Sequence, residues 1–224
     1  EIDEKDLKAN LDEKTDALKW DVQSVIFSKS SKLFSALVNN KYVVLWKRVL
    51  GSEHVYDTWD LFRKIPPLKE NILIIDITPN DKYIIMLGVG GNVYCYSIET
   101  DLCDVIFSSV SLVLSMALSH AGDLIATGDR DGRVKITKFP MNFEIDSFCI
   151  GHKGAITDLM FSKKYLFSGS SDGFVKVWSL ETSEYVDELD MSTLIDMPVS
   201  SLSNICLRNL ACKKCTTIVE IEEL

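Results

Sequence analysis

The spacing of apolar and polar residues along the middle of the chain predicts β-strands rather than helices. Between residues 20 and 190, short apolar runs rich in Val, Ile, Phe and Tyr are separated by turn residues, as expected for pleated, half-buried segments. No stretch in this range keeps a period of about 3.6 residues for even three turns, so no amphipathic helix is predicted there. We therefore expect an all-β fold.

Four segments repeat one order of features: an apolar run, a second short run, a turn and a third strand-like run. Equivalent turn positions are spaced by 50, 41 and 41 residues and are occupied by Lys41, Gly91, Gly132 and Gly173. The ends of the third runs recur at the same spacing, at Trp46, Tyr96, Thr137 and Trp178. Two of the turns contain Asp-Gly and one contains Gly-Gly, dipeptides that favour tight hairpins. A period of about 40 to 45 residues with several strands per repeat is typical of a β-propeller blade.

The repeats divide the chain into one propeller domain over 20–224 and an acidic N-terminal segment or edge strand over 1–19. The expected units are 20–64, 70–107, 110–147 and 152–190, followed by a degenerate unit over 195–224. Residues 48–70 lengthen the first unit, and we expect a long inter-strand loop there that carries Trp59 and Phe62. About five units make a small ring. Because residue 1 is Glu rather than Met, we expect a piece of a longer ring.

The composition narrows the kind of partner that this domain contacts. The chain has 24 Lys and Arg residues against 33 Asp and Glu residues, a formal net charge of −9. Such a surface argues against a protein that grips nucleic acid alone and favours docking onto other proteins. The longest apolar runs are too short to span a bilayer, and no signal peptide is expected. The 6 cysteines follow no regular framework, which favours free thiols in the nucleus or cytoplasm.

The last clear repeat contains four residues with the spacing of a WD-repeat hydrogen-bond network: His152, Ser168, Asp172 and Trp178. In WD-repeat blades these residue types form a buried chain from Trp through Ser and His to Asp. A buried polar group must be paired, or it destabilises the fold by about 1–3 kcal/mol. We expect a structural role for all four, in preference to a His/Ser/Asp catalytic set.

No metal or cofactor site is predicted. Cys212 and Cys215 form a single C-x-x-C with Cys206 nearby, whereas a structural zinc site needs four ligands and the histidines lie far away in the sequence. The glycine-rich stretch GVGGN falls inside an expected hairpin, not between a strand and a helix, so it is no phosphate-binding loop. We expect a protein without enzymatic activity of its own.

One short segment, GDRDGRVKITKFP, concentrates positive charge in an otherwise acidic chain, with Arg130, Arg133, Lys135 and Lys138. Strand alternation places Arg133 and Lys135 on one face, opposite to Val134 and Ile136. Two interpretations are open. The segment is either a solvated outer strand or a basic patch that docks onto an acidic partner surface, where Arg can pair with carboxylates through two hydrogen bonds.

The same segment carries a more specific motif. It runs through Asp129-Arg130-Asp131, Arg133, Lys135, Phe139-Pro140, Phe143 and Asp146 to Phe148-Cys149-Ile150-Gly151-His152. This run resembles the hallmark segment of the WD-repeat, non-catalytic subunit of the tRNA (guanine-N7-)-methyltransferase. The resemblance covers about residues 20–190 and is strongest over 110–190.

The resemblance implies a seven-bladed ring without a cofactor and without a membrane association. It implies a scaffold that forms a heterodimer with a catalytic, S-adenosylmethionine-dependent subunit and supports methylation of a guanine in the tRNA variable loop. Transfer RNA would be contacted mainly through that partner, in the nucleus and also in the cytoplasm. By the family's pattern, Arg130, Arg133 and Lys135 belong to the interface. The alternatives are a generic WD-repeat adaptor, for ubiquitin ligation or ribosome assembly, and a WD protein that contacts RNA directly.

Overall fold

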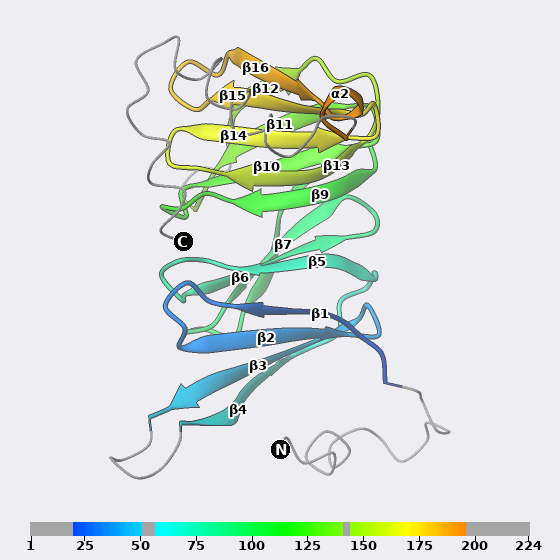
Figure 1. Cartoon of the computed structure of the whole chain (residues 1–224). Helices are drawn as coiled ribbons and strands as arrows, with labels where there is room; N and C mark the ends of the chain where they lie inside the picture. Colours follow the sequence, from blue (N-terminus) through cyan, green and yellow to red (C-terminus); the bar gives the residue numbers. More distant parts are fainter. Residues whose placement is uncertain (1–19, 51–56, 141–143, 196–224) are drawn as a thin grey trace.

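The computed structural model describes residues 20–50, 57–140 and 144–195, and in these residues it contains four antiparallel sheets of four consecutive strands each (Figure 1). Blade 1 consists of β1 (Val22–Phe27), β2 (Leu33–Val38), β3 (Tyr42–Val49) and β4 (Thr58–Ile65). Blade 2 consists of β5 (Ile72–Ile77), β6 (Tyr83–Gly88), β7 (Asn92–Ser97) and β8 (Cys103–Ser108). Blade 3 consists of β9 (Val113–Leu118), β10 (Leu124–Asp129), β11 (Arg133–Lys138) and β12 (Ile145–Ile150). Blade 4 consists of β13 (Ile156–Phe161), β14 (Tyr165–Ser170), β15 (Phe174–Ser179) and β16 (Tyr185–Asp190).

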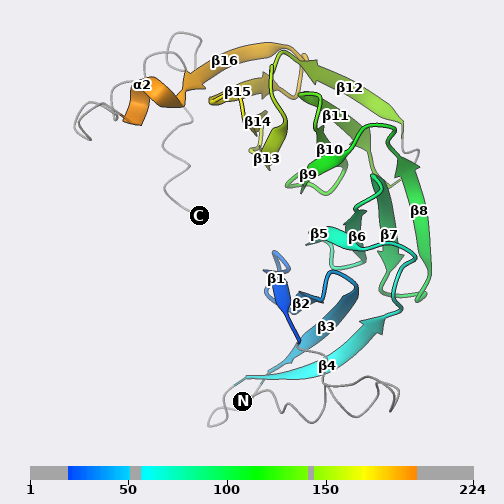
Figure 2. The ribbon, with the colours of Figure 1, turned by 90° about the vertical axis from the view of Figure 1, so that its right-hand side faces the viewer.

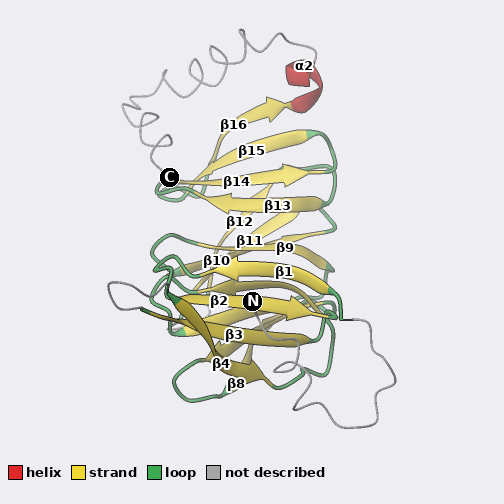
Figure 3. Cartoon of the chain, turned by 60° about the horizontal axis from the view of Figure 1, so that its bottom comes forward, coloured by secondary structure: helices red, strands yellow, loops and turns green. Residues whose placement is uncertain are grey.

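The four blades follow one another around an arc, with β1, β5, β9 and β13 on the inner side and β4, β8, β12 and β16 on the outer side (Figure 2). This arrangement confirms the predicted all-β, WD-repeat propeller fold. The one helix among the described residues is the short α2 (Met191–Ile195), which follows β16 (Figure 3). The acidic segment 1–19 and the degenerate unit predicted over 195–224 lie outside the described residues, apart from the last residue of α2.

No helix in the described ranges has the length and apolar content needed to cross a bilayer.

Each blade has a fourth strand that the repeat pattern did not reveal. The prediction of a long loop over 48–70 was wrong, because β4 forms there and pairs with β3 along Thr58–Ile65. Trp59 and Phe62 therefore belong to a strand. The reason is the position of the outermost strand, which is half exposed along its length, so its sequence lacks the apolar run that marks an inner strand.

The turns between the second and third strands show why glycine recurs at this position. Gly91, Gly132 and Gly173 have φ angles of 81°, 81° and 86°, which a residue with a Cβ atom adopts only at a cost. Lys41 occupies the equivalent position in blade 1 but does not take this conformation. There the left-handed residues are Asn39 and Asn40, with φ angles of 52° and 53°. Asparagine tolerates that region better than lysine, so the turn of blade 1 has a different shape.

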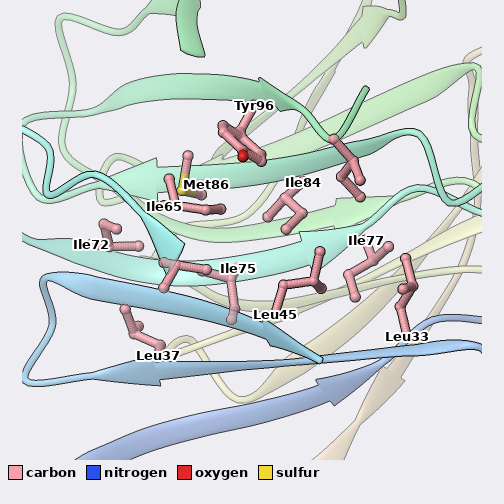
Figure 4. Close-up of a cluster of buried hydrophobic side chains, with 12 residues drawn as sticks. Leu33, Leu37, Leu45, Ile65, Ile72, Ile75, Ile77, Ile84, Met86 and Tyr96 are labelled. Carbon is pink, nitrogen blue, oxygen red and sulfur yellow. The ribbon is translucent and has the colours of Figure 1, made fainter. Parts of the chain in front are cut away.

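The core consists of apolar layers between neighbouring blades. Figure 4 shows the layer between blades 1 and 2, where Leu37 and Leu45 face Ile75 and Met86. A second layer joins blades 2 and 3, and a third layer joins blades 3 and 4 around Ile136 and Trp178. Burial of such side chains contributes about 1.5–3 kcal/mol each, so the blades are held together mainly by these layers.

Blade 1 carries a further cluster on its other face, away from blade 2. Phe34 and Trp46 stack with ring centroids 4.6 Å apart, and Trp59 meets Phe34 edge to face at 4.9 Å. Trp20, the first described residue, packs beside Tyr42 at 6.1 Å. This aromatic layer gives the first blade of the arc a small core of its own.

Candidate docking surface on blade 3

The four residues predicted to form a network in blade 4 lie in one continuous hydrogen-bonded chain. The indole N–H of Trp178 donates to Ser168 Oγ at 2.8 Å, and Ser168 Oγ lies 2.8 Å from His152 Nε2. His152 Nδ1 in turn lies 3.0 Å from Asp172 Oδ2. Because Trp178 can only donate and the ionised carboxylate can only accept, Ser168 Oγ accepts from the indole and His152 Nδ1 donates to Asp172. Every member of the chain has a partner.

Burial excludes a nucleophilic role for this set. Ser168 is 0% exposed, and its hydroxyl oxygen already accepts the Trp178 N–H. A substrate carbonyl has no access to a side chain in this position, and a nucleophilic serine must reach one. The arrangement ties β13 and the turn before it to β14 and β15, which is an architectural task.

Asp172 is the last residue of this hydrogen-bonded network, and its surroundings favour the ionised carboxylate. Burial alone would raise the pKa of Asp172, but hydrogen bonds from the Lys153 amide, the His152 ring and the Phe174 amide lower it to about 2. The Lys153 amide lies 2.8 Å from Asp172 Oδ2. The carboxylate therefore fixes the segment before β13 to the turn between β14 and β15.

Gly132 connects this network with blade 3. A Cβ atom at Gly132 would lie 2.9 Å from the carbonyl oxygen of His152 and 2.8 Å from that of Gly154. Both contacts are to backbone, which cannot move aside cheaply. The turn of blade 3 therefore packs directly on the residues that hold the network of blade 4.

The predicted basic residues Arg133 and Lys135 lie on one face of β11. In the register of blade 3, Arg133 is opposite Ile150 and Lys135 is opposite Phe148, both on the outermost strand β12. Val134 and Ile136 point to the other face and are buried between blades 3 and 4. The alternation expected from the sequence is therefore present in the strand.

The two basic residues differ in their surroundings. Arg133 is exposed, whereas Lys135 is half-buried and its Nζ lies 4.1 Å from the centre of the Phe107 ring on β8. Burial lowers the pKa of Lys135, and the negative charge of Asp129 opposes this effect. A cation held over an aromatic ring is attracted to it by about 0.5–2 kcal/mol. Lys135 is thus held in place at the outer edge of the contact between blades 2 and 3.

Two apolar residues complete this surface and were missed by the sequence analysis. Phe148 is 50% exposed and Ile150 is 69% exposed, although both belong to a regular strand. Cys149, between them, is buried against blade 4. The alternation of Phe148, Cys149 and Ile150 was the available signal, but it indicates a docking surface only when the partner strand is known to carry Arg133 and Lys135. We call Arg133, Lys135, Phe148 and Ile150 the β11–β12 surface.

Arg130, the third residue predicted for the interface, lies apart from this strand face. It is exposed in the turn between β10 and β11, and its amide donates to the Leu112 carbonyl at 2.9 Å. Lys138, at the far end of β11, forms an ion pair with Asp146 at 3.5 Å. The structure therefore brings Arg133 and Lys135 together with exposed apolar side chains, and it leaves Arg130 at the edge.

The described cysteines are Cys95, Cys103 and Cys149, and all three are free thiols. Burial raises the pKa of Cys149 to about 12, and burial together with the charges of Cys103 and Asp104 does the same for Cys95. Thiols of this kind are poor nucleophiles at neutral pH. No group of His, Cys, Asp and Glu within the described ranges has the arrangement of a metal site. Cys206, Cys212 and Cys215 lie outside the described residues.

Comparisons with known proteins point to one family. A family model described as the tRNA methyltransferase TRM82 WD40 domain matches residues 99–221, which is more than half of the 224 residues. This match covers blades 3 and 4 and the whole of the β11–β12 surface.

Curated relatives with a shared name match much of the chain at low identity. The protein named tRNA (guanine-N(7)-)-methyltransferase non-catalytic subunit wdr4 of Xenopus laevis is 23% identical over 203 residues, 88% of this chain and 49% of that protein. The Dictyostelium discoideum protein of the same name is 22% identical over 197 residues, 77% of this chain and 40% of that protein. That of Danio rerio is 32% identical over 106 residues, 45% of this chain and 26% of that protein. This chain spans at most about half the length of these relatives.

Solved structures agree on the fold alone. The computationally designed Ika8 protein superposes with a TM-score of 0.59 at 20% identity, over 74% of this chain and 48% of the designed one. The designed Ika4 protein gives a TM-score of 0.57 at 21% identity, over 71% of this chain and 91% of the designed one. The chain belongs to the family described as the tRNA methyltransferase TRM82 WD40 domain.

Proposed function

We propose that this chain is a non-catalytic scaffold subunit that binds and stabilises the catalytic subunit of the tRNA 7-methylguanosine methyltransferase. The names of the relatives support this role, because each is called a non-catalytic subunit of the tRNA (guanine-N(7)-)-methyltransferase. In this role the chain supports methylation of a guanine in the tRNA variable loop without binding S-adenosylmethionine itself. We expect it to act mainly in the nucleus, and to reach tRNA through its partner.

The observation that carries the proposal is the composition of the β11–β12 surface. Protein interfaces combine exposed aromatic and aliphatic anchors with arginine, surrounded by polar residues. Here Phe148 and Ile150 are the apolar anchors, and Arg133 and Lys135 stand directly opposite them on the neighbouring strand. A partner surface complementary to the β11–β12 surface would have an apolar centre and acidic residues around it.

The position of Lys135 makes this surface suitable for a specific partner. Its side chain is already ordered over Phe107, so less conformational entropy is lost when a carboxylate binds it. Arg133 is exposed and has the planar geometry that pairs with a carboxylate through two hydrogen bonds. The scaffold then favours the partner conformer that presents its carboxylates to both residues, and it shifts the population of that conformer by its preference.

The test is charge reversal on the surface, with a matched control elsewhere. The variant Arg133→Glu/Lys135→Glu should lose association with the catalytic subunit on co-expression and affinity purification, since removing a desolvated charge pair costs about 2–5 kcal/mol. The control Lys41→Glu/Lys64→Glu reverses two exposed charges on blade 1 and should associate normally. Both variants should keep the circular dichroism of the unchanged protein. The control should also keep its melting temperature, whereas Arg133→Glu/Lys135→Glu should melt a few degrees lower because the contact of Lys135 with Phe107 is lost.

Two results would contradict the proposal. Undiminished co-purification of the folded Arg133→Glu/Lys135→Glu variant would show that the interface with the catalytic subunit does not include the β11–β12 surface. Stoichiometric binding of S-adenosylmethionine to the isolated chain by calorimetry would contradict the non-catalytic role. A generic adaptor for another complex would fail to co-purify with the methyltransferase subunit even without substitutions.

A further inference from the structure

A second charged surface lies on the turns that join the first and second strands of each blade. These four inner turns consist of residues 28–32, 78–82, 119–123 and 162–164. Because the inner strands run in the same direction in every blade, all four turns lie on the same face of the arc (Figure 1). They lie near the inner side of the arc and away from the β11–β12 surface (Figure 2).

Contacts between the turns show that they form one continuous surface. Ser30, in the turn of blade 1, donates a hydrogen bond to the carboxylate of Asp81, in the turn of blade 2. A Cβ atom at Gly122, in the turn of blade 3, would lie 2.7 Å from Cδ of Pro79, so the turns of blades 2 and 3 are also in contact.

Electrostatics connects the remaining turn. Burial lowers the pKa of His120, and the positive charges of Lys29 and Lys163 lower it further. Lys29 comes from blade 1 and Lys163 from blade 4, so the turns at both ends of the arc act on the one histidine of blade 3. The inner turn of blade 3 has no lysine or arginine of its own, so the positive charge of this surface comes from blades 1, 2 and 4.

The inner turns are basic although the chain as a whole is acidic. All lysines in them are exposed: Lys29, Lys32, Lys82, Lys163 and Lys164. Two acidic residues stand among them, and both accept hydrogen bonds from serines, Asp81 from Ser30 and Asp123 from Ser119 at 2.7 Å. Asp76, at the end of β5, is half-buried beside Lys29. The net charge of −9 for the chain makes this excess of lysine a local feature.

The outer turns on the same face have the opposite charge. They join the third and fourth strands, and their described exposed residues include Glu99, Asp101, Glu144, Glu181 and Glu184. Arg63 of β4 pairs with Asp101 at 3.0 Å, which neutralises part of the negative charge at this edge. A basic inner zone is thus bordered by an acidic outer zone.

We propose that the inner turns bind a short phosphorylated, acidic peptide segment of a partner protein. The exposed lysines of the inner turns can bind phosphate as point charges, and these turns contain no arginine, which pairs with both carboxylate and phosphate through two hydrogen bonds. A phosphoserine carries a charge of about −1.5 to −2 and three acceptor oxygens, so a few of them would occupy several of these lysines at once.

The surrounding residues favour a peptide over nucleic acid. The inner turns contain no Phe, Tyr or Trp, and His120 is the one ring in them on which an unpaired base could stack. An RNA duplex extends beyond the inner zone, so its phosphates would meet the acidic outer turns. A short peptide fits within the basic zone and avoids them.

The binding test uses the full chain and a fluorescent peptide of about ten residues in which phosphoserine alternates with glutamate. Fluorescence anisotropy should show binding that weakens as salt rises from roughly 50 to 200 mM, as expected for phosphate contacts with lysine. The unphosphorylated peptide and a version with aspartate in place of phosphoserine separate phosphate from carboxylate recognition. A labelled RNA hairpin is the competing macromolecule.

Two double variants locate the site. Lys29→Gln/Lys82→Gln removes two inner charges and should weaken phosphopeptide binding about tenfold, with a smaller dependence on salt. Lys41→Gln/Lys153→Gln removes two exposed lysines at the opposite end of the blades and should leave binding unchanged. Melting curves verify that both variants are folded.

The proposal is wrong if the phosphopeptide does not bind, if the two double variants bind it equally, or if the RNA hairpin binds more tightly and loses affinity in Lys29→Gln/Lys82→Gln. It does not depend on the proposed function. Association with the methyltransferase subunit uses Arg133 and Lys135, which both double variants leave intact.

Discussion

Blades 3 and 4 share one backbone plan, but three of four equivalent positions carry different side chains. In blade 4 these positions hold His152, Ser168, Asp172 and Trp178, and in blade 3 they hold Ser111, Thr127, Asp131 and Thr137. The chain of blade 4 is continuous from indole to carboxylate. In blade 3 it is broken into pieces, because Ser111 binds Asp131 at 3.1 Å, Thr127 binds the Lys135 carbonyl at 3.5 Å, and the hydroxyl of Thr137 is buried without a partner.

The outer edges of blades 3 and 4 also differ in how completely their charged side chains are paired. Lys176 of blade 4 occupies the position of Lys135, but it forms an ion pair with Glu188 directly opposite on β16. In blade 3 the residue opposite Lys135 is Phe148, which is exposed. In blade 4 the four network residues and Lys176 all have partners within the blade. Blade 3 leaves a cation and apolar side chains at its surface, which is the composition that a partner protein requires.

The largest difference between the blades should come from Ser168→Ala. This change leaves the indole N–H of Trp178 without a partner and leaves His152 Nε2 with the Ser168 carbonyl alone, at 3.2 Å. It should lower the free energy of unfolding by about 2–4 kcal/mol. The matched control is Ser35→Ala, which removes one hydrogen bond from an equally buried serine to the Val44 carbonyl and should cost about 1 kcal/mol. Urea denaturation of both variants gives the comparison, and equal losses would show that the network adds nothing beyond single bonds.

A smaller effect, visible in its dependence on pH, is expected from Asp172→Asn. The pKa of Asp172 in the folded protein is about 2, below its usual value, so the ionised group stabilises the fold at neutral pH. This contribution of about 2 kcal/mol should disappear as the pH falls from about 4 to about 2. The unfolding free energies of the unchanged protein and Asp172→Asn should therefore differ at pH 7 and converge in acid. A constant difference over this range would contradict the assignment.

The smallest change should be favourable and lies in blade 3. Thr137→Val replaces a buried hydroxyl that has no partner with a methyl group of similar size. The unfolding free energy should stay the same or rise by up to about 1 kcal/mol, since an unsatisfied buried polar group is destabilising. The same measurement on the Lys41→Glu/Lys64→Glu variant serves as a reference for a change confined to the surface. A clear loss of stability in Thr137→Val would mean that this hydroxyl has a partner in solution.

The sequence predicted the repeated unit well, because its signals are local. Gly132 and Gly173 mark turns that need a left-handed residue, and the spacing from His152 to Trp178 specifies a network whose members lie within one blade. The outermost strands were harder to predict. They are half exposed and lack an apolar run, so β4 was mistaken for a loop.

The docking surface could be predicted only in part, because it depends on two strands and on a neighbouring blade. The alternation of Arg133 and Lys135 is visible in the sequence. The pairing of Lys135 with Phe148, and its contact with Phe107 from blade 2, appear only once the register of β12 and the packing of the blades are known. Burial of a lysine by a residue from another repeat leaves no local signal.

Each described sheet takes all four of its strands from one continuous stretch of chain, and this has a consequence for how the molecule folds. Every hydrogen-bonded ladder closes within about 45 residues, so a blade can form before its neighbours exist. Contacts between blades are then added one interface at a time, as in a linear array of repeats with nearest-neighbour coupling. Folding can therefore start at any blade and spread in both directions. Loss of the contacts between two neighbouring blades would separate the array into two parts, and every sheet would keep all four of its strands.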